Sequence, residues 1–224
     1  MKRIAATLLI LLAFPLTAGY AQTWLAGKHY TVLSATQHTT VPAGKVEVME
    51  VFSYACPACN SFEPTMNKLR QALPSNAQLV LLPASFNPHE DWPMFQRAYF
   101  AAQALGIAER THQAIFDAVW KTGELGIVDP GTRRLKRTLP SLQDAAGYYA
   151  RIAGVKPEAF VAAANSFSVE VKMKAADAQI VAMQVPGTPC IVVNGKYRVE
   201  MDSLRTPDEL LELVRFLVAR ESKP

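Results

Sequence analysis

Two cysteines, Cys56 and Cys59, are separated only by Pro57 and Ala58 and follow a valine-rich segment. Cysteine reacts as the thiolate, and a helix N-terminus stabilises a thiolate through its unpaired N–H groups and the helix dipole. A cysteine three residues further on lies one turn along the helix, near enough to form a disulfide with the first. The spacing therefore predicts thiol–disulfide exchange, with Cys56 as the attacking sulfur and Cys59 as the resolving sulfur. Pro57 suits the first helical position, where an N–H group has no partner in the helix.

A zinc site is the alternative for an isolated pair of this spacing, because two such cysteines form half of many structural zinc sites. The chain has no second pair, and its histidines at 29, 38, 89 and 112 show no ligand spacing. We therefore expect no metal and no other cofactor. A metal-binding or metal-delivery protein that uses Cys56, Cys59 and the third cysteine, Cys190, stays as an alternative.

The N-terminus has the pattern of a secretory signal peptide. Lys2 and Arg3 precede an apolar run over residues 4–16, and Gly19 and Ala21 are small residues at the positions that precede a cleavage site. We expect residues 1–21 to be removed after Ala21. A retained anchor is the alternative, but the run is shorter than the roughly 20 residues that span a bilayer. Export to the periplasm, where disulfides persist, is the prediction.

Composition and charge are those of an ordinary globular protein. Half of the 224 residues are hydrophobic, 19% are charged, and the formal net charge is +4. Such a small charge gives no reason to expect nucleic-acid binding. We expect a monomer.

The elements around the cysteine pair form a predicted strand–helix–strand unit. Strands are expected over residues 29–33 and 46–52, and a helix follows Cys56 because Phe62, Met66, Leu69 and Leu73 recur at helical spacing. A further buried strand is expected over residues 79–82.

The middle of the chain is predicted to be helical. Helices are expected over residues 94–105, 111–120, 142–152, 157–164 and 169–183. Between the second and third of these lies a turn followed by a basic stretch, 133–137, which we interpret as a solvated surface loop, with a contact to acidic partners as the alternative.

Strands return at the end of the chain. Residues 190–199 are predicted to form a hairpin around Asn194-Gly195, and Thr206 is predicted to cap a last helix. The order of elements predicts an α/β protein with a thioredoxin-like core, residues 22–86 and 185–224, and an inserted all-helical domain, residues 87–184.

Several segments in this order resemble the DsbA family of thiol:disulfide interchange proteins. They are Glu50–Cys59, Asn165–Phe167, Val185–Pro189 and Val193–Tyr197, and the resemblance runs from about Gln22 to the C-terminus. It implies a periplasmic oxidoreductase with a thioredoxin fold and a helical insertion. It also implies that reduced, newly exported polypeptides are the substrates and that a membrane protein of the DsbB type is the reoxidant.

The resemblance also implies roles for residues outside the cysteine pair. Thr188 and Pro189 match the family's cis-proline loop, which lies against the first cysteine and offers backbone groups to an extended substrate; an ordinary trans turn is the alternative. Glu50 matches a buried acid that assists proton transfer at the second cysteine. Alternation along the strand places Glu50 with Val46, Val48 and Phe52, which favours burial over solvation, whereas Glu47 is expected on a solvated face.

The chain departs from the family's best-known pattern at Ala58, where many strong oxidants carry histidine. A weaker oxidant, or a periplasmic reductase or isomerase, is therefore the alternative function. Isomerases of this kind carry an N-terminal dimerisation region, and the short segment before residue 46 leaves no room for one. Cys190, which follows Pro189, is interpreted as a small buried core residue, with a third active-site thiol as the alternative.

Overall fold

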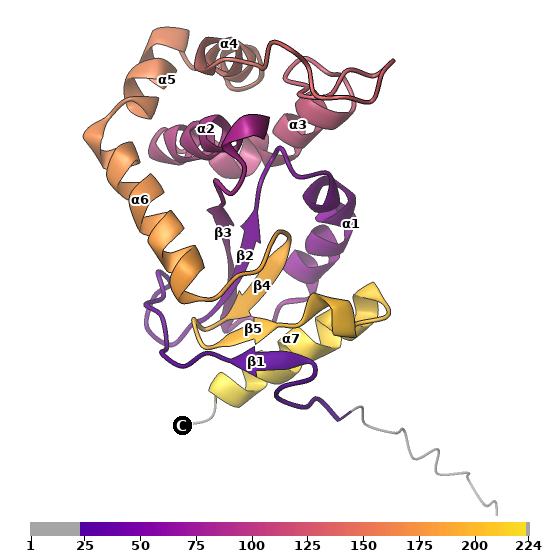
Figure 1. The fold of residues 1–224 in the computed structure, drawn as a ribbon. Helices are drawn as coiled ribbons and strands as arrows, with labels where there is room; N and C mark the ends of the chain where they lie inside the picture. The colour runs from indigo at the N-terminus through magenta and orange to yellow at the C-terminus, as the bar shows by residue number, and fades with distance from the viewer. Residues whose placement is uncertain (1–22, 223–224) are drawn as a thin grey trace, which may run out of the picture.

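A five-stranded mixed sheet forms the base of the protein in the computed structural model, which describes residues 23–222 (Figure 1). The strands are β1 (Tyr30–Val32), β2 (Val46–Phe52), β3 (Ala77–Pro83), β4 (Cys190–Val193) and β5 (Tyr197–Val199), in the spatial order β1-β5-β4-β2-β3. β2 and β3 are parallel, and the other neighbours are antiparallel. β2 is buried along its whole length, so the cysteine pair follows a central strand.

Two helices pack together on one side of the sheet. They are α1 (Pro57–Ala72), which links the parallel strands β2 and β3, and α7 (Pro207–Glu221). Met66 and Leu69 of α1 share a buried cluster with Leu213 and Leu217 of α7. The N-cap of α7 is Thr206, as predicted, and its hydroxyl accepts a hydrogen bond from the Glu209 N–H at 3.2 Å.

Five helices lie between β3 and β4 in sequence, as predicted. They are α2 (Trp92–Ala104), α3 (Ala108–Trp120), α4 (Leu142–Ala153), α5 (Pro157–Ala164) and α6 (Phe167–Ala182). In Figure 1, α2 to α5 lie beyond one end of the sheet and α6 leads back to β4. Phe52 and Tyr54 share a buried cluster with Phe95 of α2 and Phe116 of α3, so the helices pack where β2 ends. Short 3-10 helices, η1 (Pro88–Glu90) and η2 (Met201–Ser203), complete the elements.

The turn between β4 and β5 has the predicted Asn-Gly chemistry. Asn194 and Gly195 both have positive φ angles, 52° and 59°, and the Lys196 N–H donates to the Val193 carbonyl at 3.0 Å. A side chain at position 195 would collide with the backbone of Gln37, whose carbonyl oxygen would lie 2.3 Å from a Cβ atom. Glycine is therefore required there for two reasons.

The expectation that Glu47 is solvated was wrong: its exposed fraction is 0%. The connection from β1 to β2 returns across this face of the sheet and covers the side chain. The Thr40 N–H and hydroxyl both donate to Glu47 Oε2, at 2.7 and 2.9 Å. Both faces of β2 are thus covered, so alternation along the strand does not separate a buried face from a solvated one.

The basic stretch 133–137 lies in a surface loop, and its three arginines are exposed. The predicted signal peptide, residues 1–21, lies outside the described residues. Within residues 23–222, no helix is long and apolar enough to cross a membrane.

Candidate active site

Cys56 caps the N-terminus of α1. Its sulfur accepts a hydrogen bond from the backbone N–H of Cys59 at 3.3 Å, and Pro57 occupies the start of the helix. Cys59 lies one turn into the helix and is fully buried, whereas Cys56 retains a small exposed fraction of 5%. Pro57 and Ala58, between them, are exposed. Both sulfurs are free thiols in this structure.

The two sulfurs differ in acidity in the direction that thiol exchange requires. Hydrogen bonds, above all from the Cys59 thiol, lower the pKa of Cys56 to about 6, although partial burial opposes this shift. Burial is the main cause that raises the pKa of Cys59 well above its usual range, and the neighbouring Cys56 raises it further. At neutral pH Cys56 is therefore mostly a thiolate and Cys59 a thiol.

The loop before β4 closes over Cys56. The Thr188–Pro189 peptide bond is cis, as the resemblance predicted, and the Cys56 sulfur lies 3.5 Å from the Thr188 carbonyl oxygen. The fold thus brings together two segments that are 132 residues apart in the chain.

Glu50 lies on β2, between Leu81 of β3 and Ile191 of β4, and its exposed fraction is 0%. Neither carboxylate oxygen has a hydrogen-bond partner among the described residues. Burial raises the pKa of Glu50 well above 4.5, and the charge of Glu63 raises it further. An isolated carboxylate is costly to bury, so Glu50 is held as the neutral acid.

Cys190 is buried opposite Val51 in the register of β2 and β4. Burial raises the pKa of its thiol to about 12, so it carries no reactive thiolate at neutral pH. Its surroundings fit a small core residue better than a third active-site thiol. Among the described residues, no three His, Cys, Asp or Glu side chains are grouped so as to hold a metal ion.

Four residues whose contacts no sequence pattern predicted touch the cysteine segment or each other. They are Tyr54, Glu63, His112 and Trp120. The Trp120 indole N–H donates to the Tyr54 carbonyl at 2.8 Å, and His112 lies between the Tyr54 hydroxyl and the Glu63 carboxylate. Only Glu63 left a local signal, because it follows Cys59 by four residues and therefore lies on the same face of α1.

Comparisons with known proteins agree with this geometry. The family model described as "Thioredoxin" matches residues 36–215. A thiol:disulfide interchange protein DsbA from Pseudomonas aeruginosa is 33% identical over 204 residues, which cover 91% of this chain and 89% of the relative. The protein of the same name from Pseudomonas syringae pv. tomato is 31% identical over 218 residues, which cover 97% and 94%.

Solved structures give the same result. DsbA from Xylella fastidiosa superimposes with a TM-score of 0.75 at 33% identity, covering 88% of this chain and 97% of that one. DsbA from Pseudomonas aeruginosa superimposes with a TM-score of 0.73 at 33% identity, covering 88% and 94%. The predicted fold class, a thioredoxin-like core with a helical insertion, is confirmed.

Proposed function

Since this chain belongs to the DsbA family and is a thiol–disulfide oxidoreductase, we propose that it donates a Cys56–Cys59 disulfide to reduced, newly exported polypeptides. The difference in acidity between the two sulfurs is the observation that carries this proposal. A reductase or isomerase, or a metal-delivery protein, is not favoured, because the relatives are interchange proteins of the DsbA type.

In the first step, a client thiolate attacks the Cys56 sulfur, which retains some exposure, rather than the fully buried Cys59 sulfur. A client–Cys56 disulfide forms and the Cys56–Cys59 bond breaks. The electron pair of that bond passes to the Cys59 sulfur. A thiolate is unfavourable there, since burial raises the pKa of Cys59, so Cys59 takes a proton.

We assign the supply of that proton to Glu50. Its pKa is raised, so the proton is present at neutral pH, and Glu50 lies on β2, the strand that leads to Cys56. Its carboxylate oxygens have no competing hydrogen-bond partner among the described residues. After the transfer, Glu50 regains a proton from solvent.

In the second step, another client thiol loses its proton to solvent and attacks the client sulfur of the mixed disulfide. Cys56 leaves as a thiolate, which its low pKa favours. Two client thiols are oxidised to a disulfide, and the same two electrons reduce the protein's disulfide to the Cys56 thiolate and the Cys59 thiol.

The client segment is expected to lie beside Thr188 and Pro189. The Thr188 carbonyl oxygen is next to the Cys56 sulfur, so backbone groups of this loop are positioned to pair with an extended chain. Pro57 and Ala58 are exposed and form the adjoining surface.

The cellular setting belongs to the same proposal. Residues 1–21 act as a signal peptide, the mature protein works in the periplasm, and a DsbB-like membrane protein restores the disulfide. Residues 22–86 and 185–224 form the redox domain, and residues 87–184 form the helical domain inserted into it.

The reduction potential of the cysteine pair, measured against glutathione, tests this proposal. We expect a value well above the about −270 mV of thioredoxin, because a stabilised Cys56 thiolate favours the reduced form. A Cys190→Ala variant is the control and should have the same potential. A value at or below that of thioredoxin would favour a reductase.

A further inference from the structure

Helix α3 contacts the residues on both sides of the cysteine pair. Trp120, at its end, donates to the Tyr54 carbonyl at 2.8 Å. Two turns earlier, His112 Nδ1 lies 2.9 Å from the Tyr54 hydroxyl. Tyr54, two residues before Cys56, is thus held at both its backbone and its side chain by a helix of the insertion.

The second ring nitrogen of His112 contacts α1 beyond the cysteines. Nε2 lies 3.3 Å from Glu63 Oε1, and both side chains are almost completely buried. A buried carboxylate is strongly destabilising unless it is paired. His112 supplies the hydrogen-bond partner for Glu63.

One tautomer of the imidazole fits both hydrogen bonds. Burial raises the pKa of Tyr54 well above 10.0, so its hydroxyl keeps its proton and can donate to His112 Nδ1. Nε2 then carries the ring proton and donates to Glu63. A neutral imidazole in this tautomer satisfies both partners at once.

We propose that His112 is a positioning residue for the proton step: its hydrogen bonds hold the Glu63 side chain of α1 and the Tyr54 side chain in place, and Glu63 in turn acts on Glu50, the acid that serves Cys59. This rests on the role of Glu50 in the proposed function. It adds a residue of the helical insertion, distant in sequence, to the control of the reaction.

The charges around Glu50 are consistent with this arrangement. Glu63 and Arg70 of α1, Cys56 at the start of α1, and Tyr99 of α2 interact electrostatically with Glu50. After burial itself, Glu63 is the largest cause of the raised pKa of Glu50, and Arg70 opposes it. Loss of the Glu63 charge therefore shifts Glu50 towards ionisation, which leaves less of the acid form to protonate Cys59.

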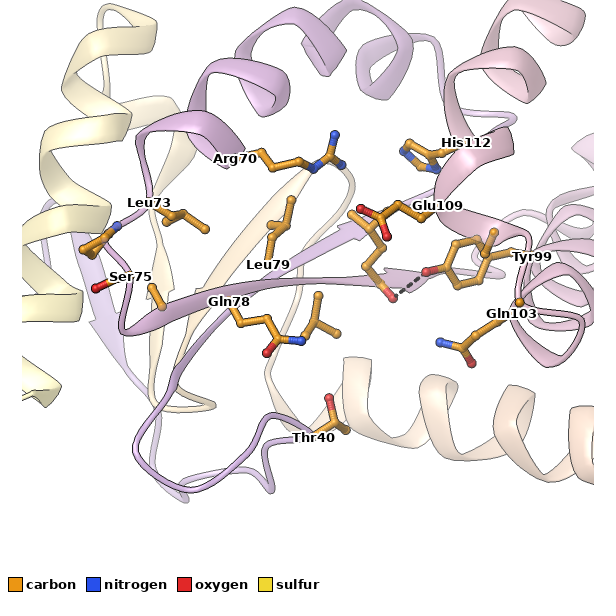
Figure 2. Close-up of a pocket in the computed structure, with 16 residues that line it drawn as sticks. Thr40, Arg70, Leu73, Ser75, Gln78, Leu79, Tyr99, Gln103, Glu109 and His112 are labelled. Carbon is orange, nitrogen blue, oxygen red and sulfur yellow. Dashed lines mark hydrogen bonds between the residues drawn. The ribbon is translucent and has the colours of Figure 1, made fainter.

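Access to His112 from outside makes a chemical rescue possible. Its ring lies at one end of a pocket of about 750 Å³, close to Glu109 on the same helix and near Arg70 of α1 (Figure 2). Truncation of His112 would extend this pocket, and added imidazole could enter the vacated position.

The test measures, from pH 5 to pH 8, the single-turnover rate at which a dithiol peptide reduces the Cys56–Cys59 disulfide. His112→Ala should be roughly tenfold slower at pH 8, a part of the ~10²–10⁴-fold that a positioned acid supplies. The deficit should shrink towards pH 5, where solvent protonates Cys59 readily. Imidazole should restore the rate of His112→Ala.

Two conservative variants separate the contacts. His112→Gln retains an N–H donor towards Glu63 and should keep most of the rate. His112→Asn retains a group that can pair with the Tyr54 hydroxyl but has no donor that reaches Glu63, so it should be slow. His29→Ala, which truncates a buried histidine that packs against Trp24 of the other core cluster, is the matched control and should react at the wild-type rate. If His112→Ala fails to fold, the comparison of Gln with Asn decides.

Glu50→Gln distinguishes the two proposals. If Glu50→Gln is slow and His112→Ala is normal, the role of His112 is refuted and that of Glu50 stands. If Glu50→Gln is as fast as wild type, the proton step itself is refuted, and the role of His112 with it. If the Ala, Asn and Gln variants are equally slow and imidazole has no effect, His112 only supports the fold.

Discussion

The Cys56 thiol should make a pH-dependent contribution to the stability of the reduced protein. The pKa of Cys56 falls from an ordinary 9.0 to about 6 in the folded protein. Between these two values Cys56 binds more protons in the unfolded chain than in the folded one, so its contribution to the free energy of unfolding rises with pH. The contribution is complete above pH 9 and is lost as the pH falls through 6.

The size of this contribution follows from the same two values. One pKa unit corresponds to about 1.4 kcal/mol, so the Cys56 thiolate adds at most ~4 kcal/mol, reached above pH 9. At pH 7 it adds about 1.4 kcal/mol and at pH 5 almost nothing. The oxidised protein has no thiolate and gains none of this.

Urea unfolding of fully reduced protein at pH 5, 7 and 8.5 measures the effect. The free energy of unfolding of wild type minus that of Cys56→Ser should increase by about 1.4 kcal/mol between pH 5 and pH 7. Cys190→Ala is the matched control, because the pKa of Cys190 is raised to about 12 and its thiol does not titrate in this range. Parallel curves for wild type and Cys56→Ser would refute a stabilised thiolate at position 56.

Three further outcomes are expected. Cys56→Ser should not oxidise client proteins, whereas Cys59→Ser should accumulate mixed disulfides on non-reducing gels, because the resolving thiol is missing; equal trapping by both variants would reverse the roles of the sulfurs. Thr40→Ala should lower the free energy of unfolding by ~1–3 kcal/mol in urea, because the buried Glu47 carboxylate loses the Thr40 hydroxyl as a hydrogen-bond donor and keeps only the backbone N–H, and an unchanged midpoint would contradict this. The exported protein should begin at Gln22 by N-terminal sequencing, and a retained N-terminus would indicate an anchor.

The parts of the site that could be predicted from sequence are those set by local chemistry. The spacing of Cys56 and Cys59 and the proline between them place one sulfur at a helix cap and the other one turn inside, and the structure agrees. The burial of Glu50 followed from its apolar neighbours on β2. The helices were predicted, but α3 begins at Ala108 rather than at residue 111. Its first turn, directly after Gly106 and Ile107, is Ala-Glu-Arg, and these residues add little to the apolar pattern from which the helix was predicted.

The parts that could not be predicted depend on contacts between distant segments. Glu47 is buried because an irregular connection crosses its face of the sheet and supplies Thr40, and irregular segments leave no periodic pattern. His112 was considered only as a metal ligand, by its spacing from other histidines. Its partners, Tyr54 and Glu63, become neighbours only when α3 packs against the start of α1.

The most direct test of the central claim is the stoichiometry of disulfide transfer. Oxidised protein is mixed with an equal amount of a reduced, unfolded client, the reaction is quenched by alkylation, and both chains are mapped by mass spectrometry. We predict one new client disulfide for each pair of alkylated Cys56 and Cys59, with Cys190 a free thiol before and after the reaction. A client that stays reduced while Cys56 and Cys59 stay paired, or a disulfide that involves Cys190, would contradict the account.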